Sequence, residues 1–107
     1  MSQPGVLACD PAAIPPAERP EHQRVTRRLA SSATEIIEVA DGLAFQLPSE
    51  EYATVMSFVA RERCCCPFLG FRIEVSPGQG PVRLTVTGPP GVRDFLLAEL
   101  RLPTTPR

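Results

Sequence analysis

Apolar side chains recur along this chain at two spacings, one typical of helices and the other of strands. Over residues 16–30, His22, Val25 and Leu29 recur at i, i+3 and i+7, which places them on one face of a helix. The single histidine of the chain is therefore expected to face inward. The same spacing predicts two further helices, one over 49–65 through Tyr52, Val55, Met56 and Val59, and one after Gly91 through Val92, Phe95, Leu96 and Leu100.

Between these helices, apolar and β-branched residues predict strands. Residues 34–40 and 43–47 flank an Asp-Gly pair, which is a strong hairpin signal. Residues 71–75 and 82–87 alternate in the same way on either side of a Gly- and Pro-rich loop. The apolar positions expected to share the buried face of the sheet are Leu43, Phe45, Leu47, Phe71, Ile73, Val75, Val82, Leu84 and Val86.

The order of these elements repeats. Residues 34–63 and residues 71–101 both read strand, turn, strand, helix. After the first helix, two ββα units predict an α+β fold, in which a four-stranded antiparallel sheet carries its helices on one face. We expect one such domain over residues 16–102, preceded by an irregular proline-rich arm at 1–15 and followed by a frayed tail at 103–107.

Length and charge narrow the classes of function. A chain of 107 residues is long enough to bury a core without staples. A net charge of −1 argues against a nucleic-acid partner, which requires a dense basic face. The chain has no signal-peptide pattern and no apolar stretch approaching the ~20 residues of a membrane span, so we expect a cytoplasmic protein without a membrane partner.

Three of the four cysteines are adjacent, at the predicted end of the second helix. Glu62 precedes Cys65 by three residues and Cys66 by four, the spacings that put side chains on one helical face. Cys64 is expected to point elsewhere, and Pro67 to end the helix. The sequence therefore predicts a helix terminus at which one carboxylate and two thiols converge.

The thiols at this terminus favour metal binding over unaided catalysis. Cytoplasmic thiols are kept reduced, and adjacent cysteines make a poor disulfide framework. The negative end of the helix and the charge of Glu62 both raise thiol pKa, which opposes an activated nucleophile. A bound cation removes that difficulty because coordination deprotonates the thiol. Thiolates favour soft ions, here mercury, Cu(I), arsenite or zinc, although the paired Cys spacing of zinc sites is absent.

We expect Cys65 and Cys66 to be the main metal ligands. We expect the arm to close over the helix terminus, so that Cys9, the only cysteine of the arm, becomes the third ligand. His22 is expected beside this site or as its fourth ligand. Cys64 is left without a role.

The run Glu62-Arg63-Cys64-Cys65-Cys66-Pro67-Phe68, together with Cys9 and the later run 84–89, resembles a group of small uncharacterised bacterial proteins with a Glu-x-x-Cys-Cys-Pro-Phe motif. The resemblance implies an association with resistance to mercury or other heavy metals. Cys64 departs from the pattern as an extra cysteine. The combination of two cysteines and a carboxylate is also similar to the trio of organomercurial lyases, which have a different and longer chain.

Two other functions stay open at this point. In a cysteine-dependent enzyme for thiol redox chemistry or organomercurial cleavage, Cys65 and Cys66 would react and Glu62 or Asp10 would donate the proton. In a structural or dimerising domain the cysteines would only pack, and the partner would be a second copy of the chain. Thiol reactivity distinguishes the packing role, and turnover distinguishes the enzyme.

Overall fold

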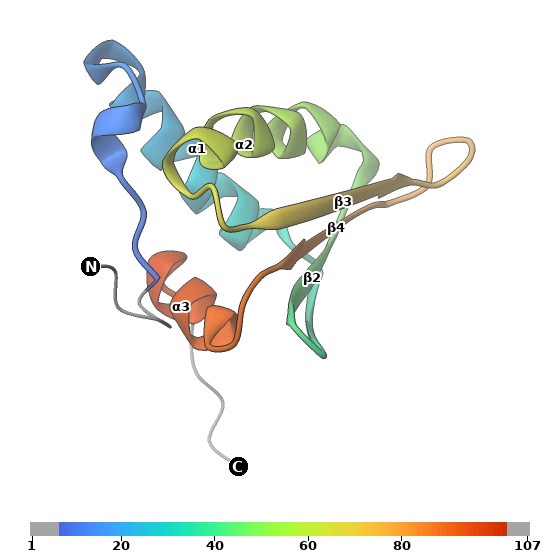
Figure 1. Cartoon of the computed structure of the whole chain (residues 1–107). Helices are drawn as coiled ribbons and strands as arrows, with labels where there is room; N and C mark the ends of the chain where they lie inside the picture. The colour runs from blue at the N-terminus through green and yellow to red at the C-terminus, as the bar shows by residue number, and fades with distance from the viewer. Residues whose placement is uncertain (1–6, 103–107) are drawn as a thin grey trace.

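The computed structural model describes residues 7–102, so residues 1–6 of the predicted arm and the predicted tail at 103–107 lie outside it. The main elements are α1 (Arg19–Ser32), β1 (Glu35–Val39), β2 (Gly42–Leu47), α2 (Tyr52–Cys65), β3 (Gly70–Val75), β4 (Val82–Thr87) and α3 (Val92–Glu99) (Figure 1). Short 3-10 turns stand at Pro11–Ala13, Pro16–Glu18 and Ser49–Glu51. None of the helices in the described part is long and apolar enough to cross a membrane.

The sheet has four strands in the order β1-β2-β4-β3, and every neighbouring pair is antiparallel. The hairpins β1–β2 and β3–β4 meet through the central pair β2–β4. Val39 pairs with Gly42, so the first hairpin turns through Ala40 and Asp41. A Cβ atom at Gly42 would clash with the Val86 carbonyl of β4, which explains the glycine there. The predicted α+β fold with two ββα units is confirmed.

One hydrophobic core joins the sheet to all three helices. From β2 and β4 it takes alternate residues of one face, and the helices add buried side chains from their inner stripes. The core residues of the sheet are Leu43, Phe45, Leu47, Val82, Leu84 and Val86. Those of the helices include Val25, Leu29, Val55, Phe58, Val59, Val92 and Leu96, and Leu100 joins them directly after α3. Figure 1 shows α1 and α2 side by side on the sheet.

Parts of the predicted inner face were wrong. Val75 is 57% exposed and Met56 41% exposed. Val75 pairs with Val82 and faces the same side, but β3 is an edge strand and its end leads into a loop that extends away from the helices (Figure 1). On α2 the buried stripe passes through Phe58 instead of Met56, because the helix is rotated about its axis relative to the predicted orientation. Tyr52 is exposed for the same reason.

The arm is more regular than predicted, and it reaches the end of α2. Its Asp10 N–H donates to the Cys65 carbonyl at 2.7 Å, and Ile14 is buried in the core. Arg19 Nε donates to the carbonyls of Pro11 and Ile14, both at 3.0 Å. These bonds hold the arm against the helix terminus that carries the cysteines.

Candidate metal and thiol site

The C-terminal turn of α2 supplies most of the site. Cys66 caps the helix, and its N–H donates to the Glu62 carbonyl at 2.8 Å, so the winding holds through the cysteines as predicted. Glu62, Cys65 and Cys66 are all buried. Cys64 is exposed and its thiol turns back to the Ala60 carbonyl. The helical spacing therefore separates Cys64 from the other two cysteines, as expected.

Cys9 comes from the arm and is joined to Cys66 by a disulfide. The arm was predicted to close over the helix terminus, and it does. The disulfide itself was not expected, because only neighbouring cysteines had been judged as a framework. Cys9 and Cys66 are 57 residues apart in sequence, and their Cα atoms lie 4.6 Å apart, within the range that disulfides require.

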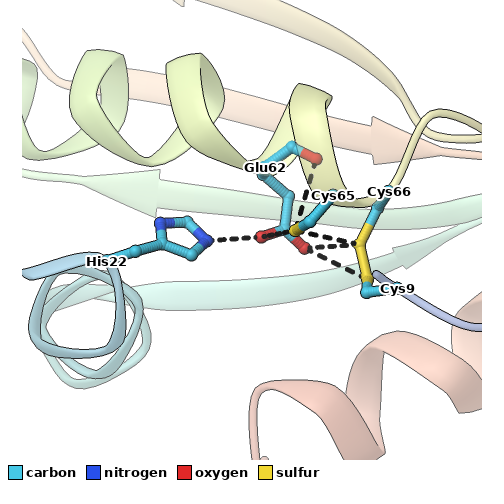
Figure 2. The surroundings of a disulfide bond; sticks show 5 residues. All are labelled: Cys9, His22, Glu62, Cys65 and Cys66. Carbon is cyan, nitrogen blue, oxygen red and sulfur yellow. Dashed lines mark hydrogen bonds and ion pairs between the residues drawn. A yellow bond between two sulfur atoms is a disulfide. The ribbon is translucent and has the colours of Figure 1, made fainter. Parts of the chain in front are cut away.

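Glu62 lies at the centre of the site (Figure 2). Its Oε1 is 2.8 Å from His22 Nε2 and 3.8 Å from Cys65 Sγ. Its Oε2 is 3.2 Å from Cys66 Sγ and 4.0 Å from Cys9 Sγ. Disulfide sulfurs carry no hydrogen, so Cys66 can donate to Oε2 only after reduction.

His22 projects from α1 and meets the site through Glu62. The ring is buried, and it packs against Phe58 with 5.9 Å between ring centroids. Its Nδ1 is buried without a hydrogen-bond partner among residues 7–102. In this structure His22 positions the Glu62 carboxylate, and its predicted role as a direct ligand stays a prediction.

Burial raises the pKa of the Cys65 thiol to about 12, with further contributions from the negative charges of Glu62 and Glu99. The rise in pKa agrees with the sequence prediction, but burial contributes more to it than the neighbouring charges do. Cys65 is therefore a neutral thiol at neutral pH in the absence of a cation.

Glu99 is the site residue that the sequence analysis missed. It is the last residue of α3. Burial raises the pKa of its carboxyl, repulsion from Glu62 adds to the rise, and His22 opposes it. Only the docking of α3 brings Glu99 near Glu62, and no spacing in the sequence signals that docking.

A cleft of about 780 Å³ opens between α1 and the end of α3, beside the site. Cys9, Glu62 and Cys65 line it, as does His22. Cys66 does not line it and is completely buried. The two sulfurs of the disulfide therefore differ in their access to the cleft.

The donor atoms form one compact group. The sulfurs of Cys9, Cys65 and Cys66 and a carboxylate oxygen of Glu62 all lie within 4.8 Å of one another. Two thiolates bound at ~2.3 Å to a tetrahedral zinc ion lie ~3.8 Å apart, and the sulfurs of Cys65 and Cys66 lie 3.7 Å apart. The three cysteines predicted as ligands are thus brought together with a carboxylate oxygen of Glu62, whereas His22 meets this group through Glu62.

Comparison with protein-family models, with curated proteins and with solved structures finds no match to this chain. The resemblance to the bacterial proteins with the Glu-x-x-Cys-Cys-Pro-Phe motif therefore stays a prediction. The function has to be inferred from the residues of the site and their geometry.

Proposed function

We propose that the reduced chain binds one soft cation through the thiolates of Cys9, Cys65 and Cys66, with Glu62 beside them as an oxygen donor. The observation that carries this proposal is the compact group of three sulfurs and a carboxylate oxygen within 4.8 Å. Its members come from the arm and from the end of α2, which are far apart in sequence. Free cysteines that only pack have no need of a carboxylate among them.

The electrostatics of the site support a cation. Glu62 is 2% exposed, and a buried carboxylate is costly unless it is paired or hydrogen-bonded. Cys65 is kept neutral by its surroundings, and coordination would deprotonate it. A bound cation would therefore pair the buried charge of Glu62 and also deprotonate Cys65.

The donor set points to thiophilic ions. Soft thiolates select ions such as mercury, Cu(I), arsenite and zinc over magnesium or calcium, which prefer oxygen. Three thiolates with one carboxylate oxygen suit a tetrahedral zinc ion, and the three thiolates alone suit mercury or arsenite. The resemblance to proteins associated with heavy-metal resistance favours mercury as the first ion to test, in a cytoplasmic protein.

The Cys9–Cys66 disulfide sets a condition on this function. Thiolates are the metal ligands, and the disulfide leaves neither of its sulfurs as a thiolate. In the disulfide form only Cys65 and Glu62 remain as donors. The proposed binding therefore belongs to the reduced form.

The test is a titration of the reduced protein with Hg²⁺, followed by ultraviolet ligand-to-metal absorption in the presence of excess small-molecule thiol. Any neighbouring pair of thiols binds mercury to some degree, so only retention against the competitor shows a preformed site. Cys65→Ser or Cys66→Ser should weaken binding by orders of magnitude. Cys9→Ser should change the absorption from that of three thiolates to that of two.

Cys64→Ser is the matched control, because Cys64 adjoins the site in sequence but is exposed outside it. Its affinity for Hg²⁺ should equal that of the parent. Equal losses at Cys64, Cys65 and Cys66 would contradict the proposal, as would complete transfer of the ion to the competitor.

A further inference from the structure

The two sulfurs of the Cys9–Cys66 disulfide are not equivalent. Cys66 is 0% exposed and is the C-cap residue of α2. Cys9 is half-buried and lines the cleft between α1 and α3. A reagent that enters the cleft therefore meets Cys9, whereas Cys66 does not line the cleft.

Access to sulfur decides the course of thiol–disulfide exchange, since the attacking thiol must contact one of the two sulfurs directly. The cleft has a volume of about 780 Å³, within the ~300–1,000 Å³ typical of sites for small molecules. A cleft of this size would admit a small thiol. Exchange chemistry requires a thiol, and the volume of the cleft fits one of low molecular weight.

We propose that a low-molecular-weight thiol enters this cleft and opens the disulfide by attack on Cys9 Sγ. The new bond joins Cys9 to the small thiol, and the bond between Cys9 and Cys66 breaks. The attacking thiol loses its proton, and the departing sulfur of Cys66 takes up a proton to become a thiol. A second small thiol then attacks the mixed disulfide, so that two thiols are oxidised to one small disulfide and the protein gains two thiols.

Attack at Cys9 releases the sulfur of Cys66 first. The released Cys66 thiol has Glu62 Oε2 at 3.2 Å as its acceptor and Cys65 at 3.7 Å beside it. The second step frees Cys9 and completes the set of three thiols. This last consequence, the opening of the ion site by a small thiol, rests on the proposed function, whereas the position of attack does not.

The position of attack is tested in the absence of metal. The double variant Cys64→Ser/Cys65→Ser serves as the background because it removes both thiols that lie outside the disulfide, including the one that shares a tryptic peptide with Cys66. Within it, Cys66→Ser leaves Cys9 free and Cys9→Ser leaves Cys66 free, and both variants lack the disulfide equally. Each is treated with oxidised glutathione, quenched in acid and digested with trypsin, which separates Cys9 from the cluster because Arg24 and Arg63 lie between them.

The adduct should form at Cys9 at least ten times faster than at Cys66, because exchange requires access to the sulfur. When the background protein, with its disulfide intact, is treated with limiting reduced glutathione, the transient adduct should be found on the Cys9 peptide. Equal rates in the two variants, an adduct mainly on the cluster peptide, or no reaction with glutathione would each overturn the proposal.

Filling the cleft tests the route. Ala30 lines the cleft from α1, and Ala30→Trp should slow reduction of the disulfide by glutathione at least fivefold. Met56→Trp is the matched control, since Met56 is exposed and does not line the cleft. If Ala30→Trp does not fold, Ala98→Trp fills the cleft from α3. Reduction at the parent rate in a folded cleft variant would overturn the route.

The two proposals fail in different measurements. An adduct on Cys9 together with loss of Hg²⁺ to a competing thiol would leave the inferred attack standing and end the proposed function. Retention of Hg²⁺ together with attack at Cys66 would do the reverse.

Discussion

The chemical state of Cys65 gives the sharpest test of the geometry around Glu62. In the Cys64→Ser protein with the Cys9–Cys66 disulfide intact, Cys65 is the one free thiol, since the chain has four cysteines. Its alkylation then reports on a single sulfur. The informative change is Glu62→Gln, which keeps the shape of the side chain and removes its negative charge.

The structure sets the size of the effect. Burial and the charges of Glu62 and Glu99 raise the pKa of Cys65 from 9.0 to about 12. At pH 8 the thiolate fraction should therefore be about a thousandfold lower than that of an ordinary thiol. Glu62→Gln removes a charge whose oxygen lies 3.8 Å from the sulfur but leaves the burial unchanged. The pKa should fall part of the way towards 9.0, and alkylation should become about tenfold faster.

The assay is the rate of iodoacetamide alkylation between pH 7 and 10, with the product measured by mass spectrometry. Glu99→Gln should accelerate the reaction less than Glu62→Gln, because Glu62 is the larger of the two charge effects. Glu74→Gln, on the exposed side of β3, is the control and should change nothing. Alkylation of the parent at the rate of a free thiol would refute the burial of Cys65, and no acceleration in Glu62→Gln would refute its electrostatic coupling to Glu62.

Three further predictions concern stability. Phe45→Ala should lower the free energy of unfolding by about 3–5 kcal/mol, while Val75→Ala should change it by less than ~0.5 kcal/mol, both measured by urea denaturation. The hydrogen bonds from Arg28 lower the pKa of Glu51, so their contribution to stability is present above the ordinary pKa of 4.5 and is lost as pH falls. The difference in thermal midpoint between the parent and Arg28→Gln should therefore shrink in acid. Because folding raises the pKa of Cys65, unfolding should become easier as pH rises above 9.0, and Cys65→Ala should flatten that decline in the midpoint.

The fold was predictable wherever one spacing of apolar residues stood alone. The alternation through Leu43, Phe45 and Leu47 admits one inward face, and all three side chains are buried. On α2 the apolar residues form two overlapping stripes, through Met56 or through Phe58, and the sequence contains nothing that ranks them. The docking of α2 against α1 and the sheet selects Phe58.

The site was likewise predictable where local spacing sets its geometry and not where tertiary docking does. Glu62 and Cys66 are related by a helical spacing, so their convergence follows from local winding and was predicted. The pairing of Cys9 with Cys66 depends on where the arm lies, and the position of Glu99 depends on how α3 docks. Both are tertiary relations between segments that no periodicity connects, which is why the disulfide and the second carboxylate were absent from the prediction.

The disulfide leaves one oxygen of the buried Glu62 carboxylate without a hydrogen-bond donor among the described residues. Among the described residues, the hydrogen-bonding contacts of Glu62 Oε2 are with the sulfurs of Cys66 and Cys9. In the disulfide form neither sulfur has a hydrogen, so a carboxylate that is 2% exposed keeps one oxygen without a donor, which is unfavourable. Reduction supplies an S–H donor from Cys66, and a cation bound by the thiolates would supply a full opposite charge. The buried carboxylate is therefore stabilised least in the disulfide form and would be stabilised most with a cation bound. A cation should consequently shift the equilibrium of the Cys9–Cys66 pair towards the reduced state.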